Sequence, residues 1–146
     1  MRKAAAALAF LVLMACSKPQ PPQGRWEGGY IGNGMMVAAR VEIGPDGLVK
    51  LSAPDVTNLQ GAGPEQLRQM REQLAASLAA GWDDVAPRPF DFDGDTFRKP
   101  GGFAPQMVWD KSSNQMTLKL YIGANPALSV PLRPVGSFHN SPWGSG

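Results

Sequence analysis

The chain has 146 residues, of which 14 are Lys or Arg and 12 are Asp or Glu, so its formal net charge is only +2. The absence of any run of basic residues argues against nucleic acid as a partner, because such binding needs a positively charged surface. The single cysteine, Cys16, excludes an internal disulfide, and the length suits one domain with a single core.

The first 15 residues predict a secretory signal peptide. Arg2 and Lys3 are basic, and an apolar run from Ala4 to Met14 follows them directly. This run is too short to cross a hydrocarbon layer of about 30 Å as a helix. A basic start, a short apolar segment and small residues at its end are typical of a cleaved signal.

The end of this segment predicts a lipid anchor. Leu13, Met14, Ala15 and Cys16 resemble the lipobox of bacterial lipoproteins, in which signal peptidase recognises the first three residues and cuts before the cysteine. The resemblance implies a diacylglyceryl group on Cys16 and a further acyl chain on its amine, and two or more chains anchor a protein stably. Ser17 in the next position implies, by the same resemblance, sorting to the outer membrane.

Residues 16–23 predict a tether between the lipid and a folded domain. Pro19, Pro21 and Pro22 fix φ and remove backbone N–H donors, so this segment is expected to be extended. Cleavage of the signal also removes two positive charges and leaves 12 basic and 12 acidic residues in the mature chain. The mature protein is therefore expected to carry no net charge.

The domain is expected over residues 24–135, and it begins with three short strands, at 24–31, 36–43 and 48–52. Asn33-Gly34 predicts a two-residue hairpin between the first two, because both residues tolerate positive φ. The second strand alternates, with Arg40 and Glu42 on the face opposite to Val37, Ala39, Val41 and Ile43. This pattern predicts one apolar and one polar face.

One helix is expected after the third strand, over residues 64–80. Pro64 suits a first-turn position, and no turn residue interrupts the segment before Gly81. Four apolar residues spaced three or four apart form a stripe on one face: Leu67, Met70, Leu74 and Leu78. The stripe is expected to pack onto the sheet or across the mouth of a barrel.

Strands resume after the helix, at 88–92, 96–99, 106–110, 115–122 and 128–133. Asp93-Gly94-Asp95 predicts a turn between the first two, and Pro131 in the last predicts an edge or a bulge. Residues 136–146 show no periodicity and are expected to form a loose tail.

The expected fold is mainly β. About eight strands with short connections favour an antiparallel up-and-down meander that closes into a small barrel, with the helix inserted. An open, strongly curved sheet packed on the helix is the alternative. Small residues alternate with large ones at the inward positions, which predicts a filled core rather than a ligand cavity: Gly28, Ala39, Trp26, Trp109, Met107, Met116, Leu118 and Leu120.

The start of the first strand resembles lipocalin-like barrels. Gly24-Arg25-Trp26 matches the G-x-W signature of that family over a handful of positions. The resemblance implies that Trp26 closes one barrel end and that a late arginine, here Arg133, packs on its ring. The chain departs from the family in its short length and in the mid-chain position of its helix.

Catalytic and metal-binding patterns are weak. His139 is the only histidine, and it stands in the expected tail without a nucleophile motif or a zinc-type spacing. Asp91, Asp93 and Asp95 hint at calcium, but an EF-hand loop needs Gly at its sixth and Glu at its twelfth position, where this chain has Thr and Gly. A hairpin tip is the better interpretation. We therefore expect no enzyme activity, no metal and no cofactor.

These observations favour a lipid-anchored protein of the outer membrane, with its domain facing the periplasm as a non-catalytic binding or structural module. Two alternatives stay open. One is a carrier or sensor that holds a small apolar ligand in the barrel, and the other is an inhibitor or accessory subunit that presents its loops to an envelope enzyme or machine. A protein partner in the envelope fits the first and the last of these functions.

Overall fold

The computed structural model describes residues 18–54, 57–102, 105–122 and 125–143. The expected signal peptide, lipobox and Cys16 lie outside these residues. The elements, in chain order, are β1 (Gly24–Gly32), β2 (Met35–Ile43), β3 (Val49–Ser52), β4 (Thr57–Asn58), α2 (Pro64–Gly81), the 3-10 turn η1 (Trp82–Asp84), β5 (Asp91–Phe92), β6 (Thr96–Arg98), β7 (Gln106–Asp110), β8 (Gln115–Ile122) and β9 (Asn125–Val135). Within the described part of the chain, no helix is long and apolar enough to cross a membrane.

The strands form one antiparallel sheet that curls into a half-barrel. The strand order is β3-β2-β1-β9-β8-β7-β6-β5, with the short β4 paired beside β2. Consecutive strands are hairpin neighbours everywhere except between β3 and β5, where α2 is inserted, and the first strand pairs with the last. The expected antiparallel meander with one helix is confirmed, and it curls into a half-barrel. The two ends of the sheet meet at one antiparallel bridge, between Val49 and Arg88.

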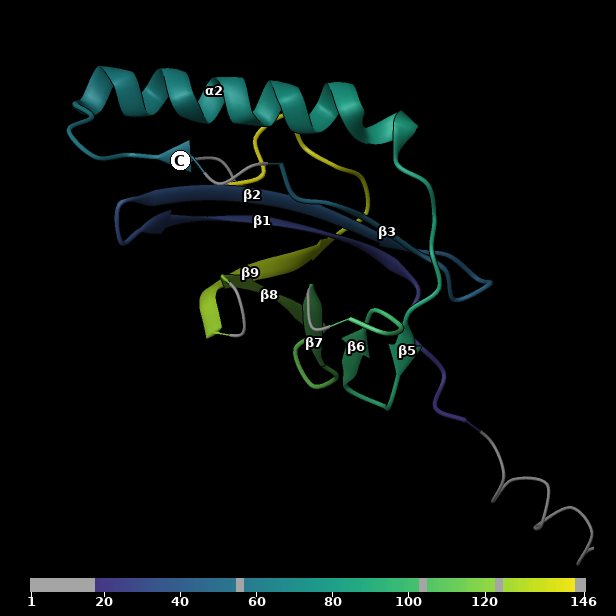
Figure 1. Ribbon diagram of the computed structural model, residues 1–146. Coiled ribbons are helices and arrows are strands. Elements are labelled where there is room, and N and C mark those ends of the chain that lie inside the picture. The colour runs from purple at the N-terminus through teal and green to yellow at the C-terminus, as the bar shows by residue number, and fades with distance from the viewer. Residues whose placement is uncertain (1–17, 55–56, 103–104, 123–124, 144–146) are drawn as a thin grey trace, which may run out of the picture.

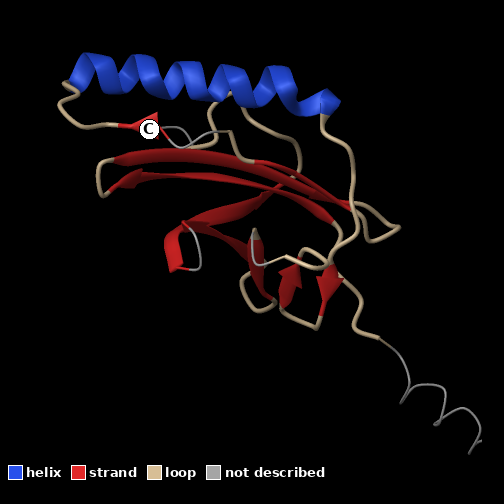
Figure 2. Cartoon of the chain, viewed as in Figure 1, coloured by secondary structure: helices blue, strands red, loops and turns tan. Residues whose placement is uncertain are grey.

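The molecule has three layers, which Figure 1 and Figure 2 show from the same side. Helix α2 covers one face of β1 and β2, and the strands β5 to β9 lie on their other face. Strand β2 is therefore buried on both faces, and six consecutive residues from Met36 to Val41 are buried. The polar face expected for this strand is covered by the helix and the end of the chain.

Helix α2 packs onto the outer face of β2. Leu74 and Leu78 are buried against Met36 and Ala38, and Leu67 and Met70 pack partly buried beside them. The expected apolar stripe is confirmed, and it lies on the sheet rather than across the mouth of the barrel. Gly63 precedes the helix in an extended conformation, and Gln66 accepts a hydrogen bond from its backbone N–H (3.2 Å). This bond caps the first turn.

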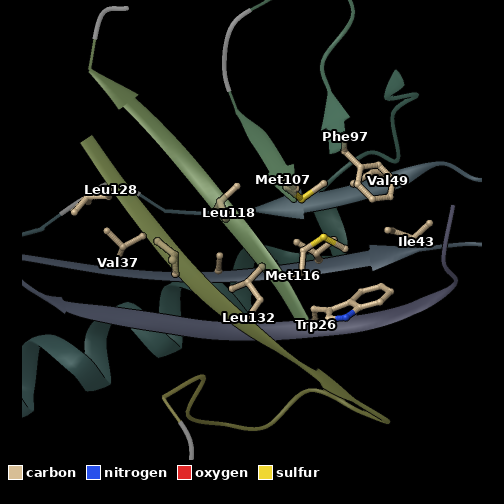
Figure 3. Packing of buried hydrophobic residues seen from close by; sticks show 13 residues of the cluster. Trp26, Val37, Ile43, Val49, Phe97, Met107, Met116, Leu118, Leu128 and Leu132 are labelled. Atoms are coloured by element: carbon tan, nitrogen blue, oxygen red, sulfur yellow. The ribbon is translucent and has the colours of Figure 1, made fainter. Parts of the chain in front are cut away.

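The interior of the half-barrel is filled with side chains. Thirteen buried residues pack together, and Figure 3 shows most of them pointing into one space between the two sheet layers. The expected inward residues are among them or pack against them: Trp26, Ala39, Met107, Met116 and Leu118 are buried, and Trp109 and Leu120 are partly buried. The alternation of small and large residues thus produces the dense packing expected of a protein interior.

Strand β9 pairs with β1 only at the start of β1 and then crosses its inner face. The pairs run from Arg25–Val135 to Glu27–Arg133 and stop there. At the next position a Cβ on Gly28 would lie 2.1 Å from the backbone oxygen of Pro131. Glycine permits this close approach, and Figure 3 shows the crossing. Pro131 lies beyond the last residue of β9 that pairs with β1. Its lack of an N–H therefore removes no hydrogen bond to β1, although β9 is a central strand of the sheet.

We expect Gly28→Ala to lower the free energy of unfolding by about 1–3 kcal/mol, because the added methyl group forces two backbones apart. Urea denaturation followed by tryptophan fluorescence measures the change. Gly136→Ala is the matched control, since no atom lies within 4 Å of its Cβ position. Equal stability of the two variants would show that β9 does not cross β1 closely.

The strands after the helix differ from expectation at their ends. Strand β5 is limited to Asp91–Phe92, although residues 88–92 were expected. Continuing its register with β6 would pair Pro89 with Pro100, and neither has an N–H to donate. Strand β9 is longer than the expected 128–133, because it pairs with both β8 and β1.

The expectation of a loose tail is wrong for residues 137–143. This segment, which we call the tail, runs between α2 and the outer face of β1 and β2 (Figure 1). Trp143 packs with the helix core against Met36 and Ala38, and Pro142 is buried. A Cβ on Gly29 would lie 2.3 Å from the Trp143 indole nitrogen, so the ring lies directly on the strand. Such tertiary contacts leave no periodic signal in the sequence.

Candidate functional site

The place where the half-barrel fails to close forms a cleft of about 700 Å³. We call it the seam cleft. Most of its lining residues are apolar, and they come from β3, from residues 84–90, and from residues 99, 100 and 105: Val49, Leu51, Asp84, Val85, Ala86, Arg88, Pro89, Phe90, Lys99, Pro100 and Pro105. Several of these residues also touch the interior core, since Val49 belongs to it and Leu51 and Phe90 pack against it.

Prolines keep the seam cleft open. Pro89 and Pro100 stand where the β5–β6 ladder would continue, and Pro105 stands just before β7 begins. Because proline donates no backbone hydrogen bond, both ladders end at the edge of the cleft. The prolines thus end β5, β6 and β7 close to the Val49–Arg88 bridge, where the two ends of the sheet meet.

Strand β3 presents a backbone edge to the seam cleft. Val49 exchanges two hydrogen bonds with Arg88, N–H to C=O in each direction at 2.8 Å. These groups therefore point away from β2, and Leu51, two residues further along, points its N–H and C=O the same way. Within the described part of the chain no backbone partner outside β2 reaches Leu51. The outer edge of β3 is therefore paired at Val49 and unpaired at Leu51.

The charged side chains of the seam cleft are mainly basic. Arg88 and Lys99 are exposed in its lining, and Asp84 is the one carboxylate among the lining residues. Neither cation forms a salt bridge to a residue that the structure describes. An apolar recess with exposed cations suits a ligand that has apolar groups and negative charge.

A second candidate lies on the outer face of β1, around a buried carboxylate. The Glu27 side chain is 0% exposed. It accepts hydrogen bonds from the backbone N–H of His139 at 3.1 and 3.3 Å, and it contacts the Nδ1 atom of the same histidine. The Arg133 guanidinium lies 3.5 Å away. This carboxylate therefore holds the tail against the sheet.

Arg40 completes this cluster from the neighbouring strand, where it stands opposite Glu27. It is buried, and it donates to the backbone oxygen of His139 at 2.9 Å. Burial lowers the pKa of Arg40, and the nearby Glu27 carboxylate opposes that shift. Its Nε atom has no hydrogen-bond partner among the described residues.

Aromatic rings and cations continue the cluster across the outer face. Arg40 lies over the Phe138 ring at 4.9 Å, and Phe138 meets Trp82 edge to face at 4.9 Å. The Nζ atom of Lys50, in β3, lies over the Trp82 ring, 4.5 Å from the ring centroid. Each contact of this kind contributes modestly, but together they fix the tail and the end of α2 to the sheet.

The Glu27–His139 pair has part of the geometry of a catalytic triad, because a buried carboxylate orients an imidazole whose side chain is 61% exposed. A nucleophile is the missing part. No hydroxyl or thiol in the described residues hydrogen-bonds to this imidazole. The contacts that are present hold the tail against the sheet.

The Trp26–Arg133 pair implied by the lipocalin resemblance is not formed. The register places Trp26 opposite Pro134 and Arg133 opposite Glu27, so the arginine lies on the face away from the indole. Trp26 is 1% exposed and donates from its indole N–H to the backbone oxygen of Asn114 at 2.8 Å. It packs inside the half-barrel near the β7–β8 turn, without the expected cation.

The acidic tip between β5 and β6 is a hairpin turn, as expected. Asp93 accepts from the backbone N–H groups of Asp95 (3.2 Å) and Thr96 (2.9 Å), and from Arg98 (2.8 Å). These bonds hold the pKa of Asp93 well below its usual range, and the bond from Thr96 has the largest effect. The described residues contain no group of three or more His, Cys, Asp or Glu side chains placed to hold a metal ion.

Sequence reasoning missed the two features that define these sites. Glu27 stands between Trp26 and Gly28 in β1, and a carboxylate at such a position is the signal that was available. The Pro-Arg-Pro stretch around Arg88 was likewise visible as an interrupted strand. Which edge it would face required the tertiary structure.

The sequence matches no family model, and comparisons with characterised proteins and with solved structures give no match.

Proposed function

We propose that this protein is a lipid-anchored protein of the bacterial outer membrane whose half-barrel is a non-catalytic binding module in the periplasm. The anchor rests on the lipobox-like sequence that ends at Cys16 and on the proline-rich segment after it. The binding role rests on one observation, the seam cleft. This apolar recess with exposed Arg88 and Lys99 lies beside an open strand edge.

The filled interior supports recognition at the surface. Thirteen buried side chains occupy the space that a carrier would keep for its ligand. A binding partner is therefore expected at the seam, where Leu51 and Phe90 are partly exposed and where the outward backbone groups of Leu51 have no partner among the described residues.

A small amphipathic ligand in the seam cleft is the second candidate. The cleft volume of about 700 Å³ falls within the range of about 300–1,000 Å³ common for small-molecule sites. Its apolar walls and two cations suit an apolar molecule with an acidic group. In this second candidate the protein is a carrier whose ligand binds in the seam cleft and not inside the barrel.

The anchor is tested by Cys16→Ala. The variant is expected to stay unprocessed by lipoprotein signal peptidase and to incorporate no labelled fatty acid, because the thiol that receives the lipid is gone. Acyl labelling of the variant at the parent level would contradict the anchor.

The binding site is tested in whole envelopes with a photo-crosslinking residue at Ala86, an exposed position in the cleft lining. The same residue at Gln73, on the exposed side of α2, is the matched control. We expect one discrete protein adduct from position 86 that is absent from position 73 and lost with Arg88→Glu. A crosslinked lipid or small molecule at position 86, found by mass spectrometry, would favour the second candidate. Equal adducts from both positions would contradict the site.

A further inference from the structure

We infer that the seam cleft binds an extended, acidic peptide segment of a partner protein as an added β-strand. The inference rests on the proposed binding function and names the kind of partner. Strand addition at an open sheet edge supplies main-chain hydrogen bonds, and pockets beside the edge select alternate side chains.

The backbone geometry of β3 supplies the docking edge. Its outward N–H and C=O groups alternate along the strand, and Val49 already uses both in the bridge to Arg88. Leu51 presents the next pair to the cleft. A strand placed about 4.8 Å from β3 would pair with the Leu51 groups, since Arg88 already occupies those of Val49.

The segment around Ala86, which lies opposite Leu51, does not pair with this free edge of β3. Continuing the Val49–Arg88 register would bring Ala86 opposite Leu51, yet the described residues show no hydrogen bond between these two. An incoming strand therefore meets an edge without competition from Ala86.

The side chains around the edge define the peptide. Leu51 and Phe90, which are only partly buried, offer apolar contacts to residues on one face of an added strand, because alternate residues of a strand point the same way. Arg88 and Lys99 outnumber the single carboxylate of Asp84, so acidic residues are favoured at the intervening positions. The partner segment is thus expected to alternate apolar and acidic residues.

The test uses an acetylated, fluorescent hexapeptide of alternating Val and Glu with the full-length protein. Two further peptides serve as controls: one has Lys in place of Glu, and one carries N-methyl groups on alternate backbone nitrogens. We expect the Val–Glu peptide to bind and each control to bind at least about 5-fold more weakly, through lost charge pairing or lost hydrogen bonds. Absence of Val–Glu binding up to about 1 mM peptide would overturn the inference.

Protein variants separate the edge from its side chains. Leu51→Pro removes the outward N–H without touching the bonds to β2, and Leu51→Ala removes the side chain alone. We expect Leu51→Pro to bind the Val–Glu peptide more weakly than Leu51→Ala does, and Arg88→Glu combined with Lys99→Glu to prefer the Lys peptide. Urea denaturation verifies that each variant is folded, and the N-methyl peptide tests the same bonds without any variant.

Two results would count against strand addition. Equal binding of the N-methylated and unmodified peptides would show that the backbone edge is not used. Displacement of the peptide by lauric acid at equal concentration would assign the cleft to a small acidic amphiphile. Either result, together with a protein adduct from position 86, would leave the proposed binding function standing and reject this inference alone.

Discussion

Glu27→Ala is expected to lower the free energy of unfolding by about 3–5 kcal/mol, because it removes one member of a buried charge cluster. The buried Arg40 would lose its nearest carboxylate, and the tail would lose the acceptor of the His139 backbone N–H. Urea denaturation measures the stability. Limited proteolysis reports separately on the tail, which is expected to become accessible to cleavage.

Two variants control for charge and for burial. Glu27→Gln keeps the volume and one acceptor oxygen, so it isolates the loss of charge and is expected to fall between the parent and Glu27→Ala. Glu42→Ala removes a carboxylate two strand positions from Arg40 that pairs with the exposed Arg25 at 2.5 Å. Because that pair is solvated, its loss is expected to cost about 1 kcal/mol or less. A similar cost for Glu27→Ala would contradict a buried cluster.

Leu78→Ala is expected to cost about 2–5 kcal/mol through lost apolar burial and the cavity that remains. The side chain is 0% exposed and lies between α2 and the outer face of β2. The same variant is expected to loosen the tail, since Trp143 packs in the same cluster. Urea denaturation and the proteolysis of the tail check both effects.

Leu67→Ala is the matched control on the same stripe of the helix. Its side chain is only partly buried at the edge of the cluster, so a smaller loss is expected. If the two variants were equally stable, the stripe would not be packed on the sheet as the structure shows. A tail that stays protected in Leu78→Ala would show that the Glu27 cluster alone holds it.

The periodic parts of the fold could be predicted from the sequence. Alternation in residues 36–43 and 115–122 predicted strands, the Leu67-to-Leu78 stripe predicted the helix, and Asn33-Gly34 predicted the first hairpin, where Asn33 and Gly34 have φ values of 51° and 73°. These signals are local, because they depend on which face of one element each residue occupies. The inward set of large and small residues followed from the same periodicity.

Which surfaces meet could not be predicted, because it depends on contacts between elements far apart in the sequence. The register of β9 on β1 placed Arg133 beside Glu27 instead of Trp26, and a register cannot be deduced from the strands taken separately. The tail was expected to be loose because it has no period, yet it is held by contacts to Glu27, Arg40 and Gly29. The seam cleft likewise depends on contacts between distant parts of the chain. The prolines could be read in the sequence. The strand edge beside them could not, because it depends on how the curled sheet brings Val49 next to Arg88.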